Sequence, residues 1–421
     1  MISPFTLFVP SFLTILYLTA LKWSGRDLHQ EWIDASLNRR EMHSAILLGC
    51  LLAVVSSVDG AVFRMNQSRP LQSTKMADQY SFPKIELHLH LDGSIRFETL
   101  LDLSKKKGIP MGNATTVPEL KKLLITDTPK NLSAVLQAFE IFLPVITNDL
   151  DAMERIAYEL CEDQAKQGVV YFEARYAPHP LINDKSSLTA RQVVEAVSRG
   201  LRRGKTDFGV DSRQILCMIC GLPQFNWELL ELVETCGELG VVGLDVAGSA
   251  SGADEKYEQS VVEVFQAAHK KGIHRTAHAG EAGGAKEVLN ALNEMYAERI
   301  GHGYRILRDE EAYRQNFLVE RRAHLEACPY SSVMTGAVVP EWNRHPIKKW
   351  ADDGADFSIS RDDPTCFDNT PKSEMALAHE KIGLTIHQLW QAQLNAAKAS
   401  FAEEPLKSEI IAKVKAGEPP Q

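Results

Sequence analysis

From Lys84 onward, short and nearly continuous apolar runs alternate with longer amphipathic segments. An apolar run of about four to eight residues bounded by turn residues predicts a strand that is buried on both faces. This pattern predicts strands at Ile85–His90, Val169–Tyr176, Gln214–Ile219, Val241–Val246, Arg275–His278, Arg299–Gly301, His324–Ala327 and Asp356–Ser360.

The segments between these runs have helical character. The expected helices are Phe97–Lys107, Asp151–Gln167, Leu188–Thr206, Asn226–Leu239, Ser260–Lys271, Ala285–Tyr296, Glu310–Leu318 and Pro346–Asp353. Strands that alternate with helices predict an α/β fold with a parallel sheet, and eight such repeats favour a closed (β/α)8 barrel of the TIM type over an open doubly wound sheet. The stretch from Leu100 to Asn148 is long and helix-rich, so we expect extra helices inserted after the first strand.

The first 75 residues follow a different pattern. Phe5–Leu21 is apolar and long enough to cross a bilayer, whereas Ala45–Val55 is too short and resembles the apolar part of a signal peptide. Met76 precedes the first predicted strand and would be a natural start for a cytosolic protein. We therefore predict a leader over residues 1–75 and a barrel domain over residues 76–421. The expected location is the cytoplasm, with secretion or membrane association through the leader as the alternative.

Composition narrows the class of partner. The chain has 421 residues and a formal charge of −9, and it lacks a basic cluster interleaved with aromatic residues, so nucleic-acid binding is not expected. The seven cysteines are scattered, which argues against a disulfide framework. Cys217 and Cys220 have redox-motif spacing, but they fall in an apolar run and are interpreted as buried, inert thiols.

Metal-binding side chains stand at the C-terminal ends of three predicted strands. His88 and His90 end the first strand, His278 ends the fifth, and Asp362 and Asp363 follow the eighth. In a barrel these ends meet at one mouth, where such enzymes place their active sites. His278 could instead be a core histidine and the two aspartates a helix cap, but these explanations would have to hold at three strand ends together.

Three imidazoles and one carboxylate form a nitrogen and oxygen donor set, for which zinc is favoured and iron, cobalt or manganese are alternatives. The fourth predicted strand, Val241–Val246, contains no lysine to bridge two ions, so one metal ion is expected. Glu281 and His302 lie close enough in sequence to the fifth and sixth strand ends to act as general acid or base.

With these motifs the chain resembles the adenosine deaminase family, in its cytosolic form, over roughly residues 82–415. The resemblance rests on Lys84–Gly93, Arg175–His179, Leu244–Gly248, His278–Glu281, Gly301–Tyr304, Cys328–Gly336, Asp362–Pro364 and Asn395–Lys398. It implies that zinc-activated hydroxide attacks C6 of adenosine or 2′-deoxyadenosine, giving inosine or 2′-deoxyinosine and ammonia, in purine salvage and the control of adenosine levels.

The resemblance also implies a role for each site residue. One zinc ion would be bound by His88, His90, His278 and Asp362. Asp362 is also counted among the catalytic residues, together with Glu281, which would protonate N1 of the purine, and His302, which would orient the hydroxide. The substrate would be bound by Asp92, His90, the Gly248 backbone and Asp363. Leu136, Phe139 and Phe142 would form a helical lid, and the protein is expected to be a monomer.

Three positions depart from the family pattern. Ser249 and Ala250 replace an acidic residue, Cys220 stands where arginine is frequent, and Arg361 replaces a small polar residue before Asp362. We expect these changes to affect the pocket rim and the surroundings of the metal ligands. A deaminase of AMP or free adenine and a catalytically silent barrel that acts as a binding protein are the alternative functions.

Overall fold

The computed structural model describes residues 79–183, 186–248 and 256–420. The predicted leader and the departures at Ser249 and Ala250 lie outside the described residues. None of the helices among the described residues is long and apolar enough to span a bilayer.

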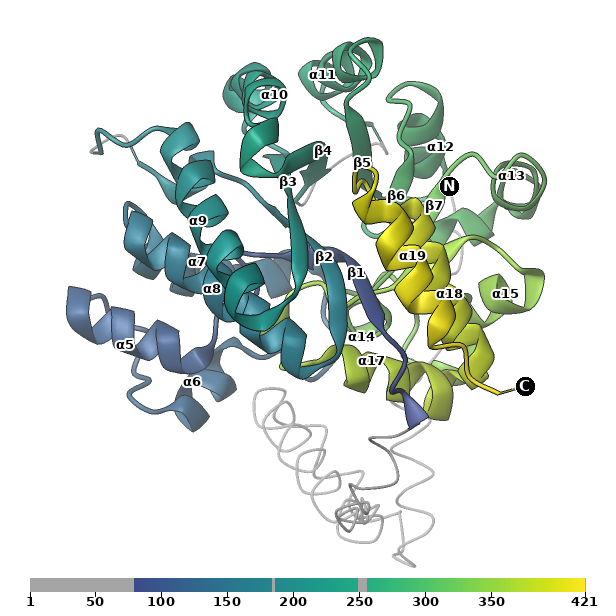
Figure 1. Cartoon of the computed structure of the whole chain (residues 1–421), viewed down its shortest axis with the longest axis horizontal. Coiled ribbons are helices and arrows are strands. Elements are labelled where there is room, and N and C mark those ends of the chain that lie inside the picture. The colour runs from purple at the N-terminus through teal and green to yellow at the C-terminus, as the bar shows by residue number, and fades with distance from the viewer. Residues whose placement is uncertain (1–78, 184–185, 249–255, 421) are drawn as a thin grey trace, which may run out of the picture. The chain divides into compact units, whose positions relative to one another are not determined.

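Eight parallel strands form one sheet in sequential order, and the helices surround them (Figure 1). The strands are β1 (Lys84–His90), β2 (Val169–Tyr176), β3 (Asp211–Ile219), β4 (Val241–Ala247), β5 (His274–Ala279), β6 (Arg299–His302), β7 (His324–Ala327) and β8 (Phe357–Ile359). The (β/α)8 prediction is confirmed, and all eight strands lie where the apolar runs predicted them. The prediction is wrong at some boundaries. In particular β8 has only three residues, and the hydroxyl of Ser360, which follows it, accepts the Leu87 N–H of β1.

One or more α-helices follow each strand of the barrel. The α-helices are α5 (Phe97–Lys107), α6 (Val117–Leu124), α7 (Leu132–Ile146), α8 (Leu150–Lys166), α9 (Ala190–Phe208), α10 (Asn226–Thr235), α11 (Gln259–Lys270), α12 (Ala285–Asn293), α13 (Glu310–Tyr313), α14 (Pro329–Met334), α15 (Pro346–Asp353), α16 (Pro364–Phe367), α17 (Pro371–Leu377), α18 (Ile386–Ala399) and α19 (Leu406–Ala416). The expected insertion after the first strand is confirmed, because α5, α6 and α7 all precede the helix that leads into β2.

Local sequence explains several helix boundaries. The side chains of Asn131 and Asp149 accept backbone N–H bonds at the starts of α7 and α8, which satisfies donors that the first turn leaves free. The single helix expected over Asn226–Leu239 is wrong, since α10 ends at Thr235 and a 3₁₀ turn over Gly237–Leu239 leads into β4.

The barrel closes between β1 and β8 at a narrow seam. The two strands share an isolated bridge between Leu89 and Asp362. There the His90 N–H donates to the Asp362 carbonyl at 3.0 Å and the Asp362 N–H donates to the His88 carbonyl at 3.2 Å. Helix α18 packs on the same two strands, and Gln393 on it accepts the Ile85 N–H at 2.7 Å. The seam is therefore formed by the segments that carry three of the four predicted metal ligands.

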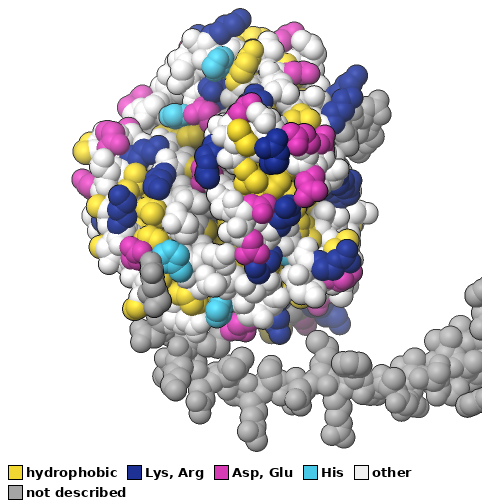
Figure 2. Space-filling view, turned by 90° about the vertical axis from the view of Figure 1, so that its right-hand side faces the viewer, with side chains coloured by type: hydrophobic (Ala, Val, Ile, Leu, Met, Phe, Trp, Pro, Cys, Tyr) yellow, Lys and Arg dark blue, Asp and Glu magenta, His cyan; other side chains and the backbone are white. Residues whose placement is uncertain are grey.

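One face of the outer surface carries mixed charge. On the face shown in Figure 2, lysine and arginine side chains are interspersed with aspartate and glutamate, and apolar side chains lie between them. Such mixing is typical of a solvated surface rather than of one that follows a phosphate backbone.

Candidate active site

The four predicted metal ligands converge at the mouth of the barrel. Their donor atoms, one from each of His88, His90, His278 and Asp362, all lie within 4.8 Å of one another. Asp362 Oδ1 is 3.3 Å from Nε2 of both His88 and His90, and the Nε2 atoms of His90 and His278 are 3.1 Å apart. The bridge at the seam and the end of β5 therefore aim four donors at one point.

This donor set fits a metal ion. His88 Nε2 is buried without a hydrogen-bond partner, which is costly for a polar atom unless something else satisfies it. Three imidazoles and a carboxylate suit zinc and similar transition metals. His88 is fully buried and Asp362 nearly so, whereas His90 and His278 are partly exposed, so the donors surround a point that remains open toward the mouth.

Buried carboxylates orient two of the histidines from behind. Glu326 Oε2 lies 2.8 Å from His88 Nδ1, and Asp245 Oδ2 lies 3.0 Å from His278 Nδ1. A carboxylate on Nδ1 fixes the ring and leaves Nε2 free for a metal ion. Arg175 joins the two carboxylates, with its guanidinium 2.7 Å from Glu326 and 3.1 Å from Asp245.

The same contacts keep both carboxylates ionised. Burial alone would raise the pKa of Glu326, but Arg175 and Arg299 outweigh it and hold this pKa well below the usual range. For Asp245, burial is likewise outweighed by His278 and Arg175, so its pKa is also lowered. Both groups therefore act as fixed negative charges behind the histidines.

Three acidic side chains at the mouth have raised pKa values instead. Desolvation, reinforced by the charge of Asp362, raises the pKa of Glu281 to about 7. Desolvation raises the pKa of Asp92 to about 7 and that of Asp363 well above its ordinary value. Glu281, Asp92 and Asp363 each have a buried oxygen without a hydrogen-bond partner. These groups can carry protons near neutral pH and have free capacity to bind a polar ligand.

His302 lies between Glu281 and the ligand Asp362. Its Nε2 is 3.5 Å from Glu281 Oε2 and 3.9 Å from Asp362 Oδ2, and its Nδ1 is buried without a partner. Desolvation and the neighbouring His88 lower its pKa well below the ordinary value, so the ring is neutral. The structure thus brings Glu281 and His302 together beside the metal ligands.

The backbone of the site is strained at two of these residues. His302 has φ 65° and Asp362 has φ 68°, in the left-handed region that non-glycine residues seldom adopt. Strain of this kind costs on the order of 1–3 kcal/mol and concentrates at functional sites. At Gly301 a Cβ atom would approach His88 Cε1 to 2.8 Å, so glycine is needed there for the imidazole to fit.

Comparison with known proteins identifies the chain. The family model for adenosine deaminase matches residues 83–417. The chain belongs to the adenosine deaminase family. It is 40% identical over 342 residues to the adenosine deaminase of Gallus gallus, covering 78% of this chain and 93% of that protein. It is 38% identical to the adenosine deaminase of Mus musculus, over 79% and 96% of the two chains.

A solved structure of an Arabidopsis N6-mAMP deaminase is also similar. It superposes with a TM-score of 0.69 at 27% identity and covers 80% of this chain and 99% of that one. The chain is accordingly an enzyme of the adenosine deaminase family, and its His and Asp cluster could hold a metal ion.

The structure places two of the departures from the family pattern, Arg361 and Cys220. Arg361, which was expected to affect the pocket rim and the surroundings of the metal ligands, is buried and paired with Glu86 at 3.0 Å behind Asp362, so it belongs to those surroundings rather than to the rim. Cys217 is buried as predicted, but Cys220 is partly exposed because β3 ends at Ile219, so the prediction is wrong for this thiol. Both cysteines are free.

The structure bears differently on the predicted contact at Gly248 and on the predicted lid of α7. Gly248 follows β4 with φ 98° directly before the undescribed segment, so only part of its surroundings is described. Of the three lid residues on α7, Leu136 and Phe139 are partly exposed, whereas Phe142 is fully buried and packs into the core. Phe142 is therefore better described as an anchor of α7 than as part of a movable lid.

Sequence reasoning missed the residues that orient the ligands. Asp245 and Glu326 received no role, although a carboxylate in the middle of an apolar strand is a sign of a buried charge that needs a partner. Tyr257 was also missed, and its hydroxyl donates to the His278 carbonyl at 2.7 Å.

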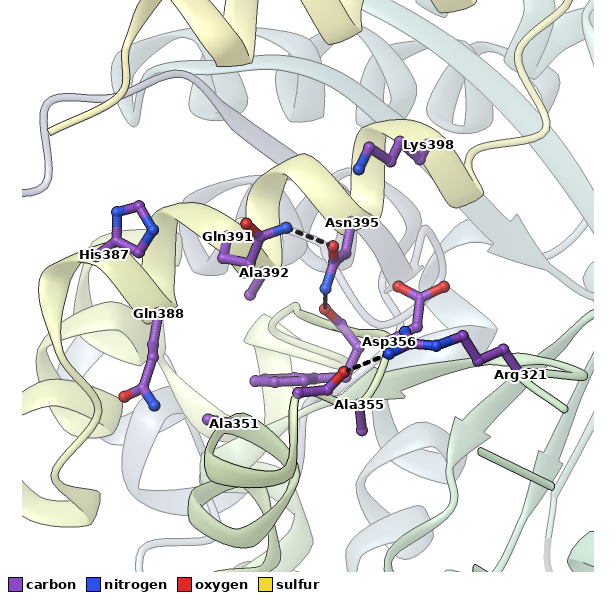
Figure 3. A pocket seen from close by; sticks show the side chains of 12 residues that line it. Arg321, Ala351, Ala355, Asp356, His387, Gln388, Gln391, Ala392, Asn395 and Lys398 are labelled. Atoms are coloured by element: carbon purple, nitrogen blue, oxygen red, sulfur yellow. Dashed lines mark hydrogen bonds between the residues drawn. The ribbon is translucent and has the colours of Figure 1, made fainter. Parts of the chain in front are cut away.

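A separate pocket of about 430 Å³ lies at the opposite end of the barrel, between α15, α18 and the start of β8 (Figure 3). Gln391 in its wall donates to Asn395 at 2.8 Å. The residues that line this pocket include none of the predicted site residues.

Proposed function

We propose that this enzyme hydrolyses the 6-amino group of adenosine and 2′-deoxyadenosine, releasing ammonia, with one zinc ion per chain. The observation that carries the proposal is the cluster at the mouth, where a protonatable Glu281 stands beside the convergence of His88, His90, His278 and Asp362. Membership of the adenosine deaminase family supports the reaction.

The four ligands would hold zinc, whose Lewis acidity makes hydroxide available from water near neutral pH. The chain's own residues supply the other requirements. Glu326 and Asp245 keep the ligand rings oriented, and neutral His302 can accept a hydrogen bond or a proton at its free nitrogen. Glu281, with a pKa of about 7, holds a proton that it can donate to ring nitrogen N1 as C6 is attacked.

Substrate contacts are proposed from the unsatisfied atoms. A carboxyl at Asp363 that keeps its proton is a suitable donor for N7, a ring nitrogen with a free lone pair. Gly93 makes room for this carboxyl, since a Cβ there would lie 1.8 Å from Asp363 Oδ1. Asp92, which directly precedes Gly93, and partly exposed His90 would bind the ribose hydroxyls, and the Gly248 N–H would bind N3.

The choice of nucleoside over nucleotide follows from charge. The side of the site assigned to ribose presents Asp92, an acidic side chain that offers a phosphate no positive charge and would repel it whenever the carboxyl is ionised. Arg361 is the cation that could have favoured AMP, but it forms an ion pair with Glu86 away from the mouth. Two relatives at 38–40% identity are named adenosine deaminases, whereas the similar N6-mAMP deaminase is 27% identical.

The test is a comparison of kcat/KM for adenosine, AMP, N6-methyl-AMP and adenine with the zinc-loaded enzyme. We expect kcat/KM for adenosine to exceed that for either nucleotide by at least about 100-fold, because the phosphate of a nucleotide would be left in the site without a paired positive charge. A preference for either nucleotide would replace the nucleoside proposal with the nucleotide alternative. The cytoplasmic location and the monomeric state remain predictions.

A further inference from the structure

A buried ion pair crosses the barrel seam just below the metal ligands. Arg361, in the turn after β8, places Nε 3.0 Å from Oε2 and 3.2 Å from Oε1 of Glu86 on β1. The side chains are 5% and 1% exposed, so the charges are removed from solvent and interact strongly. The pair joins the first and last strands of the barrel.

Both partners are held by further contacts. Gln164 on α8 donates to Glu86 Oε2 at 2.6 Å, which fixes the carboxylate on its strand. The carbonyl of Arg361 accepts from Asn369 Nδ2 at 2.9 Å, and the same amide contacts Glu374 Oε1 at 2.9 Å. Arg361 is thus held at its side chain and at its backbone.

The residue that follows Arg361 is the strained ligand. Asp362 must keep φ at 68° while its Oδ1 stays 3.3 Å from both histidine nitrogens on β1. A strained conformation persists only where its surroundings enforce it. Ser331 restrains the carboxylate itself, donating to Oδ2 at 2.7 Å, but the neighbouring backbone is restrained across the seam by Arg361 and by the bridge at Leu89.

We infer that Arg361 is a positioning residue: its ion pair with Glu86 holds Asp362 against the β1 histidines and so retains the metal ion. The inference rests on the zinc site of the proposed function. A cation at this position would exert its effect through the geometry of one ligand, without contacting the substrate. Removing the pair should therefore weaken metal retention as well as turnover.

The test compares Arg361→Met, which removes the charge but keeps the length, with Arg361→Lys, which keeps a charge for Glu86. Arg213→Met is the matched control, because Arg213 forms an ion pair with Glu403 at the other end of the barrel, with Nε to Oε2 at 3.0 Å. The readouts are the rate at which the holoenzyme loses zinc to an excess of chelator, and the gain in Tm on adding zinc to the metal-free protein.

We expect Arg361→Met to lose zinc on the order of 10-fold faster than wild type, since residues behind metal ligands influence affinity by about 10–100-fold. Its zinc-dependent gain in Tm should shrink, Arg361→Lys should recover part of both, and Arg213→Met should match wild type. Glu86→Gln should resemble Arg361→Met, and the double variant should be no worse than either single one.

Equal zinc loss from Arg361→Met and Arg213→Met would overturn the inference. So would equal behaviour of the Met and Lys variants, which would show that only side-chain volume matters. A wild-type protein that binds no zinc would instead contradict the proposed function, so the two failures are distinguishable.

Discussion

The mouth of the barrel and its interior contain the same kinds of buried acid but use them differently. In the interior, Glu326 lies 2.7 Å from the guanidinium groups of both Arg175 and Arg299, and its pKa is held low. At the mouth, no lysine or arginine among the described residues forms an ion pair with Glu281 or Asp363, the ring of His302 that lies 3.5 Å from Glu281 is neutral, and the pKa values of both acids are raised. The acids are buried in both regions, so the presence or absence of a cationic partner decides whether each acid is ionised.

The difference separates two tasks. Fixed charges in the interior hold the ligand rings rigidly, whereas protonatable groups at the mouth exchange protons and bind a polar ligand. Changes at the mouth should therefore alter rate with little effect on stability, and changes in the interior should alter stability and metal binding together.

The largest expected effect is on rate, from Glu281→Gln. The amide keeps the shape but cannot donate an acidic proton, so kcat should fall about 10²–10⁴-fold while zinc content and the free energy of unfolding stay near wild type. Steady-state kinetics with metal analysis on the same sample measures this. Near-normal turnover by Glu281→Gln would remove Glu281 from its proposed role as the acid.

The second effect is on stability, from Glu326→Gln. Neutralising the acid leaves Arg175 and Arg299 without a shared counter-charge, so urea unfolding of the metal-free protein should show a loss of about 3–5 kcal/mol at pH 7. Because the folded pKa of Glu326 lies below the unfolded value, its contribution is present at neutral pH and is lost in acid. The difference between variant and wild type should therefore shrink toward pH 3, and a constant difference would argue against the charge interaction.

A smaller effect concerns the pH dependence of rate. Glu281 must be protonated to act as an acid, and its pKa is about 7, so kcat should decline as pH rises through about 7. The residual activity of Glu281→Gln should lack this decline. Metal content has to be measured at each pH, because loss of zinc would also change the rate. A wild-type profile that is flat from pH 6 to pH 9 would contradict the assignment.

The smallest effect should come from the pocket of Figure 3. Gln391→Ala removes a hydrogen bond in that pocket, far from the ligands, and should change kcat/KM by less than about twofold. A larger change in kinetics at unchanged stability would mean that this end of the barrel communicates with the mouth.

The fold could be predicted from the chain because apolar runs of strand length mark each parallel strand. Boundaries were less predictable where tertiary contacts decide them. The hydroxyl of Ser360, just after β8, accepts backbone N–H groups of β1, and α10 stops at Thr235, where a 3₁₀ turn over Gly237–Leu239 leads the chain into β4. The leader over residues 1–75 remains a prediction.

The part of the site that lies at the C-terminal ends of the strands was predictable from the sequence. His88, His90, His278 and Asp362 converge because a barrel brings these ends together. The orienting network was not predictable, because the side chains of Arg175 and Glu326 meet across the barrel interior, between strands that are not neighbours in the sheet. Nor could the sequence show that Arg361 points away from the mouth, since its direction depends on the conformation of a single turn.

The central claim is that one zinc ion at this mouth supports adenosine hydrolysis. The most direct test is to remove the metal, add zinc back in steps, and measure bound zinc and adenosine turnover on the same samples. We predict that turnover rises in proportion to bound zinc and stops rising at one ion per chain. Full turnover by metal-free protein, or a rise that continues to two ions, would contradict this claim.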